Sequence, residues 1–255
     1  MIRESSTRQV KSVRTGFRII GILQNHDGAG LDELQRRLDL AKSTVHNYLA
    51  TLESMGYVVE QDGTYHLGLR FLTHGMAAKN RLRIRAAIDD ALPGLAATAG
   101  QPAWWITEEH GRGLFVESAV REDGTTAYGR VGKRSYLHTH APGKAILATL
   151  PETYVDDIVD YHGLPAHTKR TITDRGTLAE ELARIRDRGY AVGDGEAALG
   201  IRSVGAAFEG PAGNDHAVGV FGYSHDLATP PDRELTSALD RAVDGIRAAA
   251  ETGGP

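Results

Sequence analysis

The amino-acid sequence predicts an α+β protein of two domains, an N-terminal winged helix-turn-helix and a larger C-terminal α/β domain with a mainly antiparallel sheet. The first 70 residues show the order helix, helix, turn, helix, hairpin. Strand-like segments dominate the rest, and helices interrupt them irregularly, which favours an antiparallel sheet over a doubly wound one. The expected divisions are a flexible arm over residues 1–9, the winged helix-turn-helix over 10–69, a connector helix over 70–90 and the larger domain over 91–252.

Composition narrows the class of protein. The 255 residues include no cysteine, which excludes disulfides, thiolate catalysis and cysteine-bound zinc. The polar N-terminus does not resemble a signal peptide, and no apolar run approaches the roughly 20 residues that span a bilayer. We therefore expect a cytoplasmic protein with no membrane partner.

Charge is distributed unevenly along the chain. The formal net charge is −4, yet residues 1–80 carry ten Lys and Arg against eight Asp and Glu, while the remainder carries 19 against 25. A slightly basic head on an acidic body fits DNA contact at one end of the molecule.

Three helices are expected in the head, over residues 10–25, from Leu31 to Leu38 and from about Ala41 to Met55. Gly56 ends the third helix as a C-terminal cap. Helical spacing gives the apolar positions Val13, Phe17, Ile20 and Leu23 in the first helix, Leu31, Leu34 and Leu38 in the second, and Val45, Leu49, Leu52 and Met55 in the third.

The wing of the predicted domain is a β-hairpin. Two runs rich in β-formers, 57–60 and 64–67, flank Asp62-Gly63, and an Asp-Gly pair in this position is a strong hairpin signal.

The third helix carries the predicted DNA-binding surface. If Val45 and Leu49 point inward, a step of 100° per residue turns short polar side chains outward, with no acid before Glu53. Asn47 suits an adenine edge, and the first turn suits a phosphate. The predicted contacts are Lys42, Ser43, Thr44, His46, Asn47 and Thr51, with Lys11, Arg14 and the wing residues Asp62, Gly63 and Thr64 on the flanking backbone.

The larger domain alternates between predicted strands and helices. Strands are expected over 104–107, 113–120, 126–131, 136–140, 190–192, 201–208 and 217–223, and helices over 142–150, 151–161, 177–188 and 231–250. Pro142-Gly143 follows a strand and opens a helix, and proline suits the first helical position. Free N–H groups there would attract an anion such as a carboxylate.

Several of these segments resemble the IclR-type transcription regulators. The specific parts in the head are Lys42–His46 and the exit Tyr65-x-Leu-Gly-Leu-Arg70, and in the body Leu137–Ala145 and Gly189–Ser203. The resemblance covers nearly the whole chain and implies a GAF-like α/β effector-binding domain, no cofactor, and a homodimer or tetramer. Such a protein would bind double-stranded DNA at a pseudo-palindromic operator, under control of a small organic or sugar acid.

The resemblance also implies a set of effector-binding residues. They are Ala141, Pro142, Gly143, Asp194, Ile201, Ser203, Gly219 and Phe221. Ser203 stands where the family often has cysteine, and Asn47 where it usually has arginine. On the last strand, a shift of the alignment by one residue, to Val220 and Gly222, stays open. The identity of the acid in the pocket also stays open, because Gly193 stands before Asp194 where some family members have a second acid. Phe221 would fill or roof the pocket and favour an apolar or ring-bearing ligand.

Two enzyme classes are the alternatives, with the head then serving only as a dimerisation module. His138 and His140 lie two apart in a predicted strand, and with His162 and His167 they could bind zinc, although no HExxH motif is present. For a hydrolase, the sequence lacks the Gly-x-Ser-x-Gly motif of the nucleophile elbow. We therefore predict neither a catalytic nor a metal site.

Overall fold

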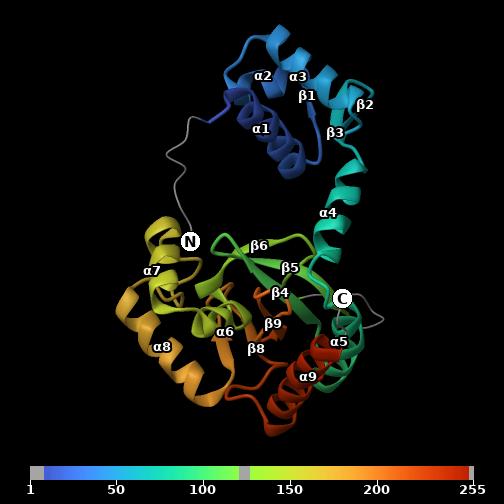
Figure 1. Ribbon diagram of the computed structural model, residues 1–255. Coiled ribbons are helices and arrows are strands. Elements are labelled where there is room, and N and C mark those ends of the chain that lie inside the picture. The colour runs from blue at the N-terminus through green and yellow to red at the C-terminus, as the bar shows by residue number, and fades with distance from the viewer. Residues whose placement is uncertain (1–8, 121–126, 253–255) are drawn as a thin grey trace. The chain divides into compact units, whose positions relative to one another are not determined.

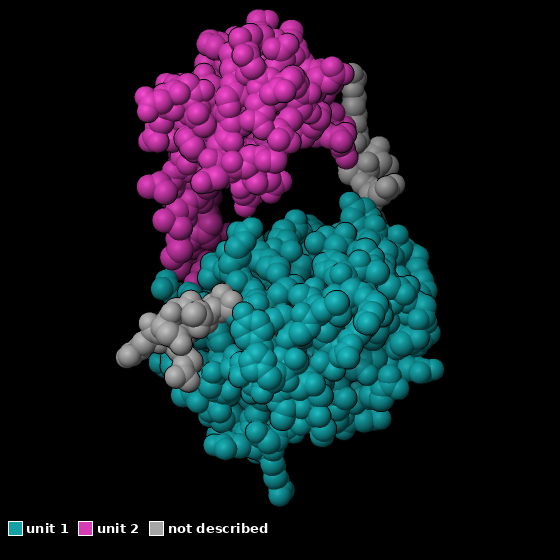
Figure 2. Space-filling view, turned by 180° about the vertical axis from the view of Figure 1, so that it is seen from behind, with its two compact units in different colours: residues 1–2, 82–255 teal, residues 3–81 magenta. Residues whose placement is uncertain are grey.

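The structure, a computed structural model, describes residues 9–120 and 127–252. The described residues divide into two compact units, one up to residue 81 and one from residue 82 onward, which Figure 2 shows in different colours. Of the predicted arm over 1–9, all but Gln9 lies outside the described residues. No helix in the described ranges is long and apolar enough to span a membrane.

The smaller unit has the predicted order of elements. Its helices are α1 (Lys11–His26), α2 (Leu31–Leu38), α3 (Lys42–Ser54) and α4 (Arg70–Asn80), and its strands are β1 (Ala29–Gly30), β2 (Val58–Gln61) and β3 (Thr64–Leu67). The wing turn between β2 and β3 is the expected one, since Asp62 and Gly63 both have positive φ, 50° and 80°. The short strand β1, which the sequence analysis missed, pairs with β3 and completes a three-stranded sheet.

The core of this unit differs from the predicted one at α1 and at the end of α3. Ile19 and Leu23 are buried, but Val13 and Phe17 are 56% and 65% exposed, and Met55 is 47% exposed. Apolar residues cover more of the surface of α1 than the core buries. The helical spacing of Val13 and Phe17 therefore predicted a face of α1 that lies outside the core. These exposed side chains form a separate apolar surface.

The predicted single connector helix is wrong. Residues 70–90 belong to two helices, α4 and α5 (Arg85–Ala99), and the chain between them leaves helical geometry, with Arg83 at φ 56°. Pro93 lies inside α5.

The larger unit is a six-stranded sheet covered on both faces by helices. Its strands are β4 (Ala103–Glu109), β5 (Arg112–Ala119), β6 (Arg134–Tyr136), β7 (Ala191–Asp194), β8 (Ile201–Glu209) and β9 (Asp215–Tyr223), and its helices besides α5 are α6 (Ala141–Thr149), α7 (Glu152–His162), α8 (Arg175–Arg188) and α9 (Arg233–Thr252). The strand order is β6-β5-β4-β9-β8-β7, and each neighbouring pair is antiparallel. The predicted α+β class with an antiparallel sheet is confirmed.

Alternation along the strands builds two separate cores. Trp105 joins the core under α5 and α9, whereas its neighbour Trp104 joins the core under α6, α7 and α8. Figure 1 shows these two helical layers on opposite sides of the sheet.

Two predicted strands in the middle of the chain are wrong. In the segment 126–131, Thr126 lies outside the described residues and 127–131 form bends and turns. In the segment 136–140, only Tyr136 belongs to a strand, and Leu137–Thr139 form a 3-10 helix. The aromatic and β-branched residues suggested extended chain, but the chain turns from the sheet edge at β6 through a 3-10 helix into α6.

Helix α6 lies unusually close to the sheet and to the turn before it. Cβ atoms placed on Gly205 and Gly219 would lie 2.8 and 2.6 Å from Pro142 Cγ, and a Cβ on Gly143 would lie 2.2 Å from the Leu137 carbonyl oxygen. Only glycine fits at these three positions. They fix the first turn of α6 against β8 and β9, which is where the predicted effector residues meet.

We predict that Gly143→Ala lowers the free energy of unfolding of the larger unit by at least about 2 kcal/mol, because backbone must move to admit one methyl group. Gly245→Ala in α9 is the matched control, since nothing lies within 4 Å of its added Cβ. The control should stabilise the protein by about 0.5–1 kcal/mol through helix propensity. Urea unfolding followed by circular dichroism measures both, and equal midpoints for the two variants would contradict the close approach.

Candidate nucleic-acid interface and ligand site

Helix α3 presents a polar outer face. Val45 and Leu49 are fully buried beneath it, whereas Ser43, His46 and Asn47 are exposed. Ala50 and Thr51 continue this exposed face toward the end of the helix, and the first acid is Glu53. The face has the size, polarity and freedom from like charge that a helix in the major groove requires.

The first turn of α3 is open to an anion in part. Its N-cap residue, Ala41, supplies no side-chain hydrogen bond, so backbone donors of the first turn remain without a side-chain cap. Lys42, however, forms an ion pair with Asp32, with 2.6 Å between Nζ and the carboxylate, and its hydrogen bond lowers the pKa of Asp32. Any phosphate contact by Lys42 competes with this partner.

The remaining predicted contacts occupy different settings. Thr44 is half-buried, and the Thr51 hydroxyl donates to the Asn47 carbonyl at 2.7 Å. Lys11 and Arg14 are exposed on the first turn of α1. At the wing, Asp62 and Gly63 are exposed and Thr64 is half-buried, while the Gly63 N–H donates to Glu60 Oε1 at 2.5 Å. The acid at position 60 was not anticipated, and it reduces the attraction of the wing for phosphate.

The strand register brings most predicted effector residues to one place. Phe221 on β9 lies opposite Ser203 on β8, which lies opposite Gly193 on β7. The Ala141 N–H donates to Ser203 Oγ at 3.0 Å, so the start of α6 sits directly on this row. Gly219 faces Pro142 from the same side, which favours the original register over the shift to Val220 and Gly222. Ile201 also joins the core on this side.

Asp194 is the exception among them. It pairs in register with Arg202, one residue beyond Gly193 and Ser203, so its side chain leaves the opposite face of the sheet. Its carboxylate forms ion pairs with Arg202 at 2.9 Å and Arg170 at 2.6 Å. The expectation that Asp194 is the acid of this site is wrong, because alternation along β7 turns it away.

Glu196 supplies the acid instead. Its residue exposure is 7%, and a Cβ placed on Gly193 would lie 3.0 Å from Glu196 Oε2 and 2.6 Å from Ser203 Oγ. The carboxylate therefore occupies the space that a side chain at position 193 would need. Glu196 Oε2 has no hydrogen-bond partner among the described residues. The Glu within the Gly189–Ser203 segment was the signal that could have identified it.

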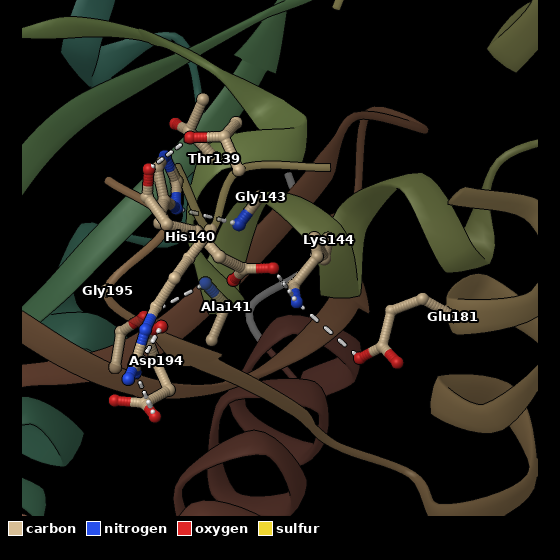
Figure 3. A network of polar contacts seen from close by, with 12 residues as sticks. Thr139, His140, Ala141, Gly143, Lys144, Glu181, Asp194 and Gly195 are labelled. Carbon is tan, nitrogen blue, oxygen red and sulfur yellow. Dashed lines mark hydrogen bonds and ion pairs between the residues drawn. The ribbon is translucent and has the colours of Figure 1, made fainter. Parts of the chain in front are cut away.

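A buried ion cluster holds Glu196 in place. Lys144 Nζ lies 2.9 Å from Glu196 Oε1 and 3.5 Å from Glu181 Oε1, and Figure 3 shows Lys144 at the start of α6 with Glu181 beside it. Burial raises the pKa of Glu196 more than the attraction of Lys144 lowers it. The region around the first turn of α6 thus already contains its own carboxylates.

The expected free N–H groups at the start of α6 are not free. The Gly143 N–H donates to His140 Nδ1 at 3.0 Å, and the Lys144 N–H donates to the His140 carbonyl at 3.0 Å. With Ala141 bonded to Ser203 and Pro142 lacking an N–H, the first turn is saturated within the protein. The predicted anion site on these amides is therefore wrong. The sequence analysis did not recognise that His140 would cap α6 and accept from the Gly143 N–H.

His140 also cannot act as the base that activates Ser135 as a nucleophile. Because His140 Nδ1 accepts from Gly143, its proton is on Nε2, which donates to Ser135 Oγ at 2.7 Å. Ser135 in turn donates to the Gly113 carbonyl at 3.2 Å. A nucleophile–base pair needs the opposite direction of proton donation.

The histidines do not form the metal site considered above. His138 and His140 belong to a 3-10 turn and a helix cap rather than a strand, and His138 Nε2 bonds the Pro165 carbonyl at 3.2 Å. His162 Nε2 bonds the His110 carbonyl at 2.7 Å. Across residues 9–120 and 127–252, no group of three or more His, Asp or Glu side chains could hold a metal ion.

A winged helix-turn-helix with a polar outer helix, joined to a separate α/β domain, defines a DNA-binding transcription regulator with an effector-binding domain. The chain belongs to the IclR family. Residues 12–62 match the IclR helix-turn-helix domain, and residues 76–248 match the bacterial transcriptional regulator IclR C-terminal domain.

Individual relatives agree with this assignment. The chain is 36% identical over 208 residues to the probable HTH-type transcriptional regulator ArcR of Halobacterium salinarum, covering 80% of this chain and 79% of that protein. It is 27% identical over 206 residues to the transcriptional repressor IclR of Escherichia coli, covering 79% and 75%. An IclR regulator from Alicyclobacillus acidocaldarius has the same fold, with a TM-score of 0.80 at 25% identity, covering 95% and 100%. These relatives are regulators, and the enzyme alternatives find no support among them.

We predict that the larger unit loses stability as pH falls. Burial lowers the pKa of His140 to about 3 and that of His216 to about 4, whereas both titrate near 6.5 when unfolded. The unfolded chain therefore binds more protons than the folded one below pH about 6.5. Each histidine should remove up to about 1.4 kcal/mol of stability per pH unit until its folded pKa is reached.

Urea unfolding as a function of pH measures this slope, and variants isolate its source. His216→Gln keeps an acceptor for the indole N–H of Trp105, which donates to His216 Nδ1 at 3.4 Å, and should flatten the pH dependence. His225→Asn, at an exposed position, should leave it unchanged. Identical slopes in wild type and His216→Gln would refute the assignment.

Proposed function

We propose that this regulator binds a pseudo-palindromic operator in double-stranded DNA through α3, and that a small carboxylic acid bound beside α6 changes its affinity for that operator. The observation that carries the proposal is the exposed face of α3, which has no acid between Lys42 and Ala50. A protein acting on the chromosome in this way would work in the cytoplasm.

Asn47 is central to the proposed readout. It is exposed at the middle of the polar face, between the buried residues Val45 and Leu49, and its amide can form two hydrogen bonds with an adenine edge. Ser43 lies one turn nearer the N-terminus of α3, where backbone and hydroxyl donors suit a phosphate, and His46 directly precedes Asn47.

An apolar groove in the smaller unit supports a homodimer. The groove has a volume of about 620 Å³ and is lined mainly by Val13, Phe17, Ile20, Tyr48, Leu52, Met55, Tyr57 and Phe71. Exposure of Val13 and Phe17 above one half leaves a large apolar area that a second copy would cover. Two copies joined at α1 would place two α3 helices on successive major grooves, as a pseudo-palindrome requires. Assembly into a tetramer is a further step of the same proposal.

A small carboxylic acid as the effector class is supported by one solved member of the family. An IclR homolog of Microbacterium hydrocarbonoxydans, 20% identical with a TM-score of 0.79 over 95% of this chain and 100% of that one, was solved in complex with 4-hydroxybenzoate. In this chain Ala141, Ser203, Gly219 and Phe221 lie together beside α6, where we propose that the acid binds. To act as a switch, the acid must favour one arrangement of the dimer by about 1–3 kcal/mol.

We predict that Asn47→Ala weakens operator binding by about 1–3 kcal/mol and relaxes selectivity at one base pair. Fluorescence anisotropy with operator duplexes, at one fixed salt concentration, measures both effects. Gln24→Ala, an exposed amide on α1, is the matched control and should bind as wild type does. Unchanged affinity for Asn47→Ala would remove this residue from the interface.

We also predict that Phe17→Glu converts the dimer to a monomer, because a carboxylate cannot be buried in an apolar contact without a partner. Sedimentation equilibrium measures the change. Leu199→Glu is the control, since Leu199 is 61% exposed in the larger unit and should leave the dimer intact. A dimeric Phe17→Glu protein would show that another surface joins the two copies.

A further inference from the structure

An exposed ion pair joins the first turns of α2 and α3. Asp32 Oδ1 lies 2.6 Å from Lys42 Nζ, and the two side chains are 76% and 57% exposed. Asp32 is the second residue of α2, and Lys42 is the first residue of α3. The pair therefore lies at the start of the helix that carries the proposed DNA-binding face.

Lys42 has no substitute within its helix, because it is the only lysine or arginine of α3. The N-cap residue Ala41 provides no side-chain hydrogen bond, and its carbonyl accepts from the N–H groups of Thr44 and Val45 at 2.9 and 3.1 Å. Attraction for a DNA phosphate at the start of α3 therefore depends chiefly on the Lys42 ammonium, with the positive end of the helix dipole behind it.

The other cations near Asp32 are held within α2. Arg36 Nε donates to the Asp32 carbonyl at 3.3 Å, and Arg37 forms an ion pair with Glu33 at 2.8 Å. The hydrogen bond and charge of Lys42 lower the pKa of Asp32, and the nearby charge of Arg36 contributes less. Lys42 is therefore the principal partner of the Asp32 carboxylate.

A DNA phosphate and the Asp32 carboxylate would compete for the same ammonium group. Both are anions that form charge-assisted hydrogen bonds with a lysine. When Lys42 binds a phosphate, it must leave Asp32, whose carboxylate then remains close to a polyanion. An exposed ion pair changes an equilibrium constant by a factor of about 1.5 to 5, so DNA can win this competition at a measurable cost.

We propose that Asp32 is an internal competitor for the phosphate contact of Lys42, and that it lowers the affinity of the smaller unit for DNA of any sequence. This inference rests on the proposed function, that α3 binds DNA. It gives a role to a residue of α2 that lies outside the predicted interface. Because every duplex carries the same phosphates, Asp32 sets affinity and not the choice of sequence.

Fluorescence anisotropy with two labelled duplexes of unrelated sequence tests the competition in the full chain. Asp32→Asn should tighten binding to both duplexes by the same factor, at least about threefold, since the proposed homodimer carries two such pairs. The gain should shrink as salt rises, because phosphate contacts are salt-sensitive. Unchanged or weaker binding overturns the inference, and so does a gain confined to one duplex. Wild-type protein that binds neither duplex would overturn the proposed function as well.

A double-mutant cycle separates competition for Lys42 from general repulsion of DNA. In a Lys42→Met background no ammonium can be released, so Asp32→Asn should change the affinity less than about 1.5-fold. An undiminished gain in that background overturns the competition.

Asp27→Asn is the matched control. Asp27 is an exposed acid at the end of α1, and asparagine also accepts its φ of 53°. This variant removes the same charge from the smaller unit without touching Lys42, so its affinity should stay close to that of wild type. A gain equal to that of Asp32→Asn would show that net charge alone is responsible and would overturn the role of Asp32.

Nuclear magnetic resonance of the Asp32 carboxyl carbon tests the ion pair without DNA. Lys42→Met should raise the pKa of Asp32 toward its ordinary value, because the cation that lowers it is gone. An unchanged pKa would show that the pair does not form in solution, and it would overturn the inference while the proposed function still stood. Circular dichroism spectra that match wild type show that the variants are folded.

Discussion

The larger domain depends on the close seating of the first turn of α6 on β8 and β9. Side chains are absent from Gly205 and Gly219 where Pro142 lies, and from Gly143 where the chain crosses Leu137. This contact permits the Ala141 N–H to reach Ser203 and directs Lys144 toward Glu196. A larger residue at any of the three glycines would lift the helix and separate the groups that form the site.

That seating also decides where charge can bind. His140 and Ser203 satisfy the amides that would otherwise attract an anion, and the Lys144 cluster fills the space behind them with two carboxylates. The start of α6 therefore presents buried carboxylates and no free amide in its first turn.

Sequence patterns predicted those parts of the molecule whose conformation depends on the local sequence alone. The Asp62-Gly63 turn, the helix ending at Gly56 and the strands over β8 and β9 were identified because turn chemistry, capping and β-branched runs each have one strong signature. The family motifs similarly led to Ala141, Ser203 and Gly219, which do converge.

The errors arose where tertiary contacts overrode a local pattern. Val13 and Phe17 have helical spacing but lie outside the core, since periodicity cannot tell a buried apolar face from an exposed one. Asp194 was chosen by motif, yet a single step along β7 places it on the wrong face. Glu196 was overlooked, because only folding brings its carboxylate within 2.9 Å of Lys144 Nζ.

Hydrogen exchange measured by mass spectrometry tests the location of the effector site most directly. With the full chain and a saturating small carboxylic acid that changes operator affinity, exchange should slow in peptides covering the start of α6 and the facing segments of β8 and β9. Protection confined to α7 and α8, or to α5 and α9, with none at the start of α6, would contradict the account.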